Sequence, residues 1–310
     1  DDPAAWTKYA RGMTAPDLLG AQGIVSGGRY IYVIPNYGPL ATVGNEKLIT
    51  RSGIALRYDT ERPISDAAAW EAFDTAARGA KPGFVGGVFD GRYVYYVPYG
   101  NAHGTGIHAN VVRFDSRAPF TAPESWQVFD LNEKLTPGQP NIGYAGGAFD
   151  GNYVYFVAST TADSRPAVVV RFDPKKPFDD VASWQRVDAA ALLGQPALGG
   201  FWGAAFDGAR LYFLPHENTP AGEPCSSRMA VYDTRKALDD ASAWLHVNLS
   251  EWSPNLCGFA SGVFDGTYLY LLPCLRSTAL RIDTRTEEIV PANAQLFQRW
   301  ESVTGATFDG

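Results

Sequence analysis

Short apolar runs alternate with polar turns along this chain, and the same order of runs returns at regular intervals. The tripeptide Phe-Asp-Gly stands at residues 89–91, 149–151, 206–208 and 264–266, each time before an aromatic and β-branched run such as RYVYYVP or TYLYLLP. Successive copies are 57 to 60 residues apart. Because a fixed period of this size is the signature of repeated structural units, the sequence predicts one repeat domain in preference to two unrelated ones.

Residues 84–130 show the content of one unit. FVGGVF and RYVYYV read as two strands joined at Asp90-Gly91, a dipeptide typical of two-residue type I′ hairpin turns. NVVRFD follows as a third strand, and SWQVFD, which contains Trp126, follows as a fourth. Four antiparallel strands repeated around an axis describe the blade of a β-propeller.

The tryptophans recur at one position of the repeat, so their number indicates the number of units. Trp70, Trp126, Trp184 and Trp244 each lie 11 residues after the aspartate that ends the third strand. A fifth pair of second and third strands has no tryptophan at that distance, whereas the segment around Trp6 has the fourth-strand pattern. We therefore predict an all-β fold, a five-bladed β-propeller of four-stranded antiparallel blades. Its ring would be closed by the N-terminal strand around Trp6, which removes exposed sheet edges.

This count makes residues 1–310 a single β-propeller domain. Its repeat units are about 21–74, 84–130, 144–188, 201–248, and 259–285 together with 1–10. The repeat does not place the tail, residues 286–310, which ends in TFDG and has the pattern of a first strand. We favour the inner position of the first blade for this tail, because residues 21–28 fit that position less well; a truncated repeat is the alternative.

The order of strand, Asp-Gly turn, YVY strand, V-x-R-[FY]-D and tryptophan resembles kelch-type propeller repeats over roughly the whole chain. The Gly-Gly doublet of kelch units is absent after the second strand, where this chain reads VPYG, VAST, LPHE or LLPC. The resemblance implies a propeller architecture. It does not choose a function, because kelch-like propellers include both protein-interaction scaffolds and copper oxidases.

The amino-acid composition limits the kinds of partner that this protein is expected to bind. Hydrophobic residues make up 45% of the chain, enough for a large core, so a disordered chain is excluded. The formal net charge is −7 and no basic run occurs, which argues against nucleic acid and against an anionic membrane surface. No run approaches the roughly 18 apolar residues of a membrane-spanning helix. We expect a soluble protein with no nucleic-acid or membrane partner, and the oligomeric state stays open.

The three cysteines, Cys225, Cys257 and Cys274, all fall in the last two units and on the same class of loop. Three are too few for a disulfide framework. Free thiols and a single loop-pinning disulfide are both compatible with this placement. The second favours a secreted or periplasmic location.

A repeated residue builds the repeat, so functional residues are expected where the repeat breaks. In a four-stranded blade the Asp-Gly turns and the third-to-fourth connections emerge on one face, called here the turn face, and all other connections emerge on the opposite loop face. The long irregular segments all belong to the loop face: 35–53, 98–109, 158–166, 215–228, and the connections 131–143, 189–200 and 249–258. Because loops on a rigid scaffold commonly carry binding sites, we predict one asymmetric pocket there.

Aromatic and polar residues on these loops indicate a small polar ligand, with a carbohydrate as the best match. An apolar aromatic wall with a few polar groups at its rim is the usual chemistry of such a site. Trp202 breaks the period, whereas Phe84, Tyr144, Phe201 and Phe259 recur and read as core. The expected ligand-binding residues are Tyr37, Tyr99, Asn101, Trp202, Asn218 and Arg276.

Three loop histidines, His103, His108 and His216, leave two interpretations open. They could converge on a zinc or copper ion, for which imidazole is a suitable ligand, or they could be solvated loop residues with no common centre. No HxH or HExxH spacing supports the metal.

An enzyme is the next alternative to a binding protein. The candidate catalytic carboxylates for glycoside-type hydrolysis are Glu46, Asp163 and Glu217, whose separations the sequence does not supply. A protein-interaction scaffold is the alternative from another class.

Overall fold

The computed structural model describes residues 20–43, 46–99, 106–161, 164–216, 225–274, 278–286 and 289–298. These residues form an all-β structure of antiparallel sheets. None of the helices in this part of the chain is long and apolar enough to cross a membrane.

Five sheets have four strands each, paired in chain order within each unit. The first contains β1 (Ala21–Gly27), β2 (Tyr30–Pro35), β5 (Ile54–Asp59) and β6 (Trp70–Asp74). The second contains β7 (Phe84–Phe89), β8 (Tyr93–Pro98), β9 (Asn110–Asp115) and β10 (Trp126–Asp130). The third contains β11 (Gly143–Phe149), β12 (Val154–Thr160), β13 (Val168–Phe172) and β14 (Trp184–Asp188). The fourth contains β15 (Phe201–Phe206), β16 (Arg210–Pro215), β17 (Arg228–Asp233) and β18 (Trp244–Asn248). The fifth contains β19 (Phe259–Phe264), β20 (Tyr268–Pro273), β21 (Thr278–Asp283) and β22 (Ala294–Gln298).

Helical segments are short. The α-helices are α1 (Leu131–Leu135) and α2 (Ala189–Leu193), each following a fourth strand. The 3-10 turns that precede the fourth strands are Ala67–Ala69, Pro123–Ser125, Val181–Ser183, Ala241–Ala243 and Pro291–Asn293. Two further 3-10 turns are Thr75–Arg78 and Leu249–Glu251.

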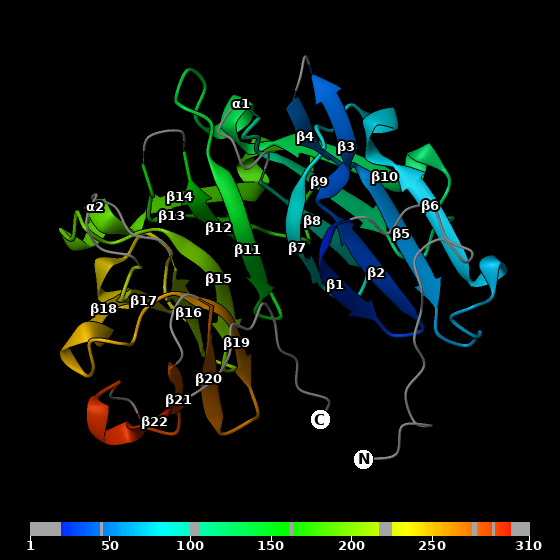
Figure 1. Ribbon diagram of the computed structural model, residues 1–310. Helices are drawn as coiled ribbons and strands as arrows, with labels where there is room; N and C mark the ends of the chain where they lie inside the picture. The colour runs from blue at the N-terminus through cyan, green and yellow to red at the C-terminus, as the bar shows by residue number, and fades with distance from the viewer. Residues whose placement is uncertain are drawn as a thin grey trace.

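The first strands of successive sheets pack against one another in chain order: β1 on β7, β7 on β11, β11 on β15, and β15 on β19 (Figure 1). Each sheet therefore presents its inner strand to a common centre and its fourth strand to the outside. Large aromatic side chains fill the spaces between neighbouring sheets. Phe73 of the first sheet, for example, stacks on Trp126 of the second with ring centroids 4.4 Å apart. In the described residues, closure of the ring between the fifth sheet and the first is not shown.

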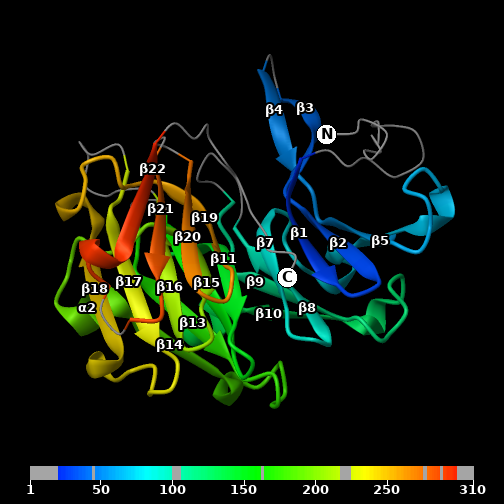
Figure 2. The ribbon, with the colours of Figure 1, turned by 90° about the horizontal axis from the view of Figure 1, so that it is seen from below.

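The number of sheets differs from the predicted five. The long segment 35–53, expected to be irregular, contains a two-stranded sheet of its own, formed by β3 (Tyr37–Val43) and β4 (Glu46–Arg51). The described residues thus form six sheets. Figure 2 shows β3 and β4 projecting away from the first sheet.

The outer strand of the fifth sheet also differs from the prediction. It is β22, which pairs with β21 through Ile282 opposite Ala294 and Thr278 opposite Gln298. Ala294 therefore occupies the position that tryptophan holds in the other sheets, as the pairing of Phe172 with Trp184 shows. The segment around Trp6, outside the described residues, is not needed for this place.

The inner strand of the first sheet is β1, residues 21–27, and not the TFDG tail. β1 pairs with β2 through Gly27 opposite Tyr30 and Ser26 opposite Ile31. The weak sequence match of this segment misled the prediction, because backbone pairing does not require the Phe-Asp-Gly side chains. The tail itself, residues 299–310, lies outside the described residues.

The Asp-Gly turns are built one residue later than predicted. The amide of Asp90 donates to the carbonyl of Tyr93, so the two turn residues are Gly91 and Arg92, with Gly91 at a φ of 95°. The Asp90 carboxylate accepts from the amides of Arg92 and Tyr93 at 2.8 and 2.6 Å, and from the Tyr95 hydroxyl at 2.7 Å. The same three contacts recur at Asp150, Asp207 and Asp265.

A second recurring contact ties the strands of a sheet together. The third-strand arginine lies over the ring of the tyrosine that opens the second strand: Arg57 on Tyr30, Arg113 on Tyr93, Arg171 on Tyr153, and Arg281 on Tyr268, at 4.2 to 4.3 Å from the ring centroid. The guanidinium also donates to a fourth-strand side chain, Glu71, Gln127, Gln185 or Gln295. We call this set the Tyr–Arg stack.

Candidate functional site

Half of the predicted site residues fall in the described part of the chain. Tyr37, Tyr99, Trp202, His108 and His216 are described with their side chains, and Glu46 with its backbone only, in β4. The remaining predicted residues lie outside the described ranges: Asn101, His103, Asp163, Glu217, Asn218 and Arg276.

Three of the predicted residues come together on the loop face. The Trp202 ring stacks on His216, with centroids 4.5 Å apart and planes 27° from parallel. Tyr99 meets the same indole edge-on, at 5.8 Å. Tyr99 follows β8 of the second sheet, whereas Trp202 and His216 belong to the fourth, so the contact reaches past the third sheet. We call these three residues the aromatic cluster.

The backbone explains why Trp202 takes this position. Each inner strand has a register irregularity near its first residues, and in β15 it lies between Phe201 and Gly203. A bulge of this kind re-aims the side chain of the extra residue. The corresponding residues of the third and fifth sheets are Ala145 and Ala260. Trp202 is half-buried, unlike its neighbour Phe201, which is fully buried in the core.

His216 is held at the end of β16. Its amide donates to the carbonyl of Gly200, and its carbonyl accepts from the amide of Ser226, at 3.0 Å each. The residue is buried. The next described residue, Cys225, forms a disulfide with Cys257, in the connection into β19. Of the two interpretations of the cysteines, the structure shows the loop-pinning disulfide, with Cys274 outside it.

Arg165 lies close to the start of the fourth sheet. A side chain at Gly199 would meet the carbonyl of Arg165, so the two backbones run in close contact beside Phe201 and Trp202. The guanidinium of Arg165 donates to the Thr160 hydroxyl at 2.7 Å. The third sheet thus adds a cation and a hydroxyl to the same end of the molecule as the aromatic cluster.

His108 does not act as an open ligand in this structure. Its Nε2 donates to the carbonyls of Pro82 and Gly83 at 3.1 and 3.0 Å, and its Nδ1 accepts from the amide of Asn110. Burial lowers the pKa of this imidazole to about 4, so it stays neutral at physiological pH. Both ring nitrogens are used by the backbone, and His108 anchors the connection into β7.

A metal centre therefore finds little support in the described residues. Because both ring nitrogens of His108 are already hydrogen-bonded, His108 is not available as a metal ligand. His216 is then the one described histidine left in the predicted set, since His103 lies outside the described residues. No group of three histidine, cysteine, aspartate or glutamate side chains in the described ranges is arranged to hold a metal ion.

Tyr37 belongs to a different set of contacts. The guanidinium of Arg51 lies over its ring at 4.4 Å from the centroid, and Arg51 also donates to the side chain of Asn36. Asn36 is fully buried and donates to the carbonyl of Phe84 at 2.8 Å. This set joins the first two sheets.

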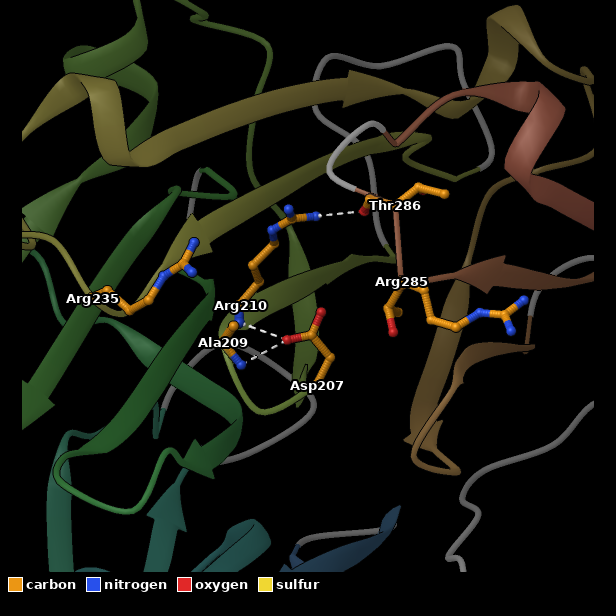
Figure 3. A pocket seen from close by; sticks show the side chains of 7 residues that line it. Asp207, Ala209, Arg210, Arg235, Arg285 and Thr286 are labelled. Atoms are coloured by element: carbon orange, nitrogen blue, oxygen red, sulfur yellow. Dashed lines mark hydrogen bonds between the residues drawn. The ribbon is translucent and has the colours of Figure 1, made fainter.

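A pocket of about 220 Å³ lies on the opposite face, where sequence reasoning expected only plain turns. It is formed by residues of the fourth and fifth sheets (Figure 3): Asp207, Ala209, Arg210, Arg235, Thr284, Arg285 and Thr286. The signal that could have revealed it is Arg210, because the other four sheets have tyrosine at this position. That break in the repeat was missed because the whole turn face was assigned to the scaffold.

Comparison of the chain with models of known protein families found no match, and neither did a search of curated proteins.

Proposed function

We propose that this protein is a propeller-type binding protein whose loop face takes a small polar ring ligand, with carbohydrate as the ligand class. The observation that carries the proposal is the aromatic cluster. It joins side chains of the second and fourth sheets, and its central residue, Trp202, stands where the third and fifth sheets have alanine.

The chemistry of the cluster supports a sugar. The apolar face of a pyranose packs on indole and phenol rings, while neighbouring hydroxyl, imidazole and guanidinium groups bond to its hydroxyls. Trp202 is half-buried and does not belong to the hydrophobic clusters between the sheets. The Arg165 guanidinium, which donates to the buried Thr160 hydroxyl, supplies a cation at the same end of the molecule.

The architecture fits this proposal. The four-stranded antiparallel sheets are compatible with propeller blades, and we propose that they are kelch-like in strand order while lacking the Gly-Gly doublet. Among the first strands of the described sheets, only β15 has a tryptophan at this position, which favours one ligand site over a set of equivalent ones.

A glycan array tests the proposal with two variants made from the repeat's own residues. Trp202→Ala introduces the residue of the third and fifth sheets, so the fold is expected to survive while sugar binding is lost. Val85→Ala makes the matching change in the second sheet and should leave binding intact. If the wild-type protein binds no glycan, or if Trp202→Ala binds as well as wild type, the proposal is wrong and a protein-interaction scaffold becomes the better interpretation.

A further inference from the structure

The fourth sheet lacks the Tyr–Arg stack in all three of its parts. The pairing of Tyr212 with Val231, and of Val231 with Leu245, matches that of Tyr95 with Arg113 and of Arg113 with Gln127. Val231 and Leu245 thus replace the arginine and the glutamine. The tyrosine two residues before this level is replaced by Arg210. The three changes remove every partner that the stack would have offered to a side chain at this place.

Arg210 is directed from β16 across to the fifth sheet. Its Nη1 donates to the carbonyl of Thr286 at 3.4 Å, as Figure 3 shows. The residue is half-buried, and in the described part of the chain no carboxylate pairs with it. A partly buried guanidinium without a counter-charge is unfavourable, because desolvation is not offset by an ion pair.

Two further guanidinium groups line the same pocket. Arg235 and Arg285 each pair with the aspartate two residues earlier, Asp233 and Asp283, at 2.8 and 2.6 Å. Both arginines are exposed, with side-chain exposures of 67% and 65%. Exposed pairs of this kind are weak because solvent screens them, so both guanidinium groups can share their donors between the aspartate and a ligand.

The one carboxylate of the pocket wall is committed to the turn. Asp207 accepts from the amides of Ala209 and Arg210 through Oδ1, and from the hydroxyl of Tyr212 through Oδ2. Its lone pairs are therefore directed into the hairpin. The hydroxyls of Thr284 and Thr286 donate to the carbonyls of Thr267 and Asp283, so the donors that face a ligand are the guanidinium groups.

We propose that this pocket binds a tetrahedral oxyanion, a phosphate or sulfate group, with Arg210 as its principal ligand. The planar guanidinium fork matches the oxygen spacing of such groups and bonds to two of them at once. The volume of about 220 Å³ lies below the roughly 300–1,000 Å³ of pockets that enclose whole organic ligands. It suits an anionic group on a larger molecule. The site is separate from the aromatic cluster and does not rest on the sugar proposal.

Calorimetric titration with sodium phosphate and sodium sulfate, at constant ionic strength balanced with chloride, tests the proposal. Wild-type protein should bind one equivalent saturably, and the preferred anion identifies the group. Arg210→Tyr restores the residue of the other four sheets, so it should fold normally. It should weaken binding at least about tenfold, the loss expected when a hydrogen bond to a charged group is removed.

Two further variants separate the site from general charge effects. Arg285→Gln changes an exposed residue of the pocket and should also weaken binding. Arg92→Ala removes an arginine from the corresponding turn of the second sheet, where it pairs with Asp115 at 2.6 Å, and should leave binding unchanged. Absence of saturable binding by the wild-type protein, equal binding by Arg210→Tyr, or equally tight binding of acetate would each overturn the proposal.

Discussion

At Asp90 and its three equivalents, one carboxylate closes the hairpin from within. It satisfies two backbone amides of the turn and holds the hydroxyl of a buried tyrosine. A buried hydroxyl without a partner costs about 1–3 kcal/mol, so the tyrosine explains why aspartate recurs where asparagine or glycine would also turn the chain. The repeated aspartates therefore belong to the scaffold, although aspartates in a row of motifs suggest catalysis.

The burial of His108 leads to a prediction about how the stability of the protein depends on pH. Its pKa is lowered from 6.5 to about 4, chiefly by burial, whereas the unfolded chain has an ordinary imidazole. As the pH falls from 6.5 to 4, the imidazole of His108 binds a proton in the unfolded state but not in the folded state. The free energy of unfolding should be fully retained above pH 6.5 and fall by about 3 kcal/mol over this window.

Urea denaturation at pH 7.5 and pH 4.5 measures this effect, with His108→Gln as the comparison. Glutamine can still donate to the carbonyls of Pro82 and Gly83 but does not titrate, so the variant should lose much of the pH slope. The depressed pKa values of Asp59 and Asp283, about 2, act mainly below pH 4. Burial also lowers the pKa of His246, so this residue supplies a pH slope of the same sign that the variant retains. An unchanged slope in the variant would contradict the assignment.

Among the elements, β22 shows that a fourth strand can form without the tryptophan that begins the other fourth strands. The other fourth strands begin with a tryptophan whose indole N–H donates to the carbonyl six residues earlier, as Trp126 does to Phe120 at 2.7 Å. β22 begins with Ala294 but keeps the 3-10 turn in front of it and the pairing with β21 behind it. Backbone hydrogen bonds and Gln295, which accepts from Arg281, hold the strand in place.

Truncation after Val290 should therefore destabilise the protein, because it exposes the edge of β21 and removes Gln295, which accepts from Arg281. A marked drop in unfolding temperature is expected. Deletion of residues 1–10 is the matched control and should leave the fifth sheet intact. Hydrogen exchange at residues 278–283 reads the result directly: protection should be lost on truncation and kept on deletion. The reverse pattern would return the outer strand to the segment around Trp6.

The strands were predicted correctly where the side chains of the motif recur. They were predicted poorly where only the backbone pairing recurs. The Phe-Asp-Gly turns and the tryptophans predict four strands in each of the middle units, and these are confirmed. β1 was judged a weaker match than the tail, and β22 was missed, because Ser26 and Ala294 stand where the motif has aromatic residues, although main-chain pairing tolerates both. β3 and β4 were missed because the segment was expected to be irregular.

The site was predicted in part for a similar reason. Trp202 was identified because it breaks the repeat, and the structure places it against Tyr99 and His216. His108 was misjudged because the sequence does not tell a solvated imidazole from one that bonds to the backbone. Arg210 breaks the repeat as plainly as Trp202, but only the three-dimensional register links it to Val231 and Leu245.

At the scale of the whole molecule, the interface between the fourth and fifth sheets is unlike the others at both of its ends. On the turn face it lacks the Tyr–Arg stack, which in other sheets carries the arginine on to the neighbouring sheet, as Arg171 reaches the Tyr232 hydroxyl at 3.0 Å. On the loop face it carries the disulfide between Cys225 and Cys257. The buried core between these two sheets is therefore accompanied by a covalent link on the loop face only.

Reduction of this disulfide should therefore loosen the last two sheets against each other. The bridged residues are 32 positions apart, a separation for which chain-entropy arguments give about 3–4 kcal/mol of stabilisation. Urea denaturation of Cys257→Ser should show a loss of this order, and reductant should lower the wild-type midpoint without affecting the variant. Cys274→Ser, which changes the cysteine outside the bridge, should shift the midpoint far less. If reductant leaves the wild-type midpoint unchanged, the disulfide does not hold this interface, and packing between β15 and β19 must do so alone.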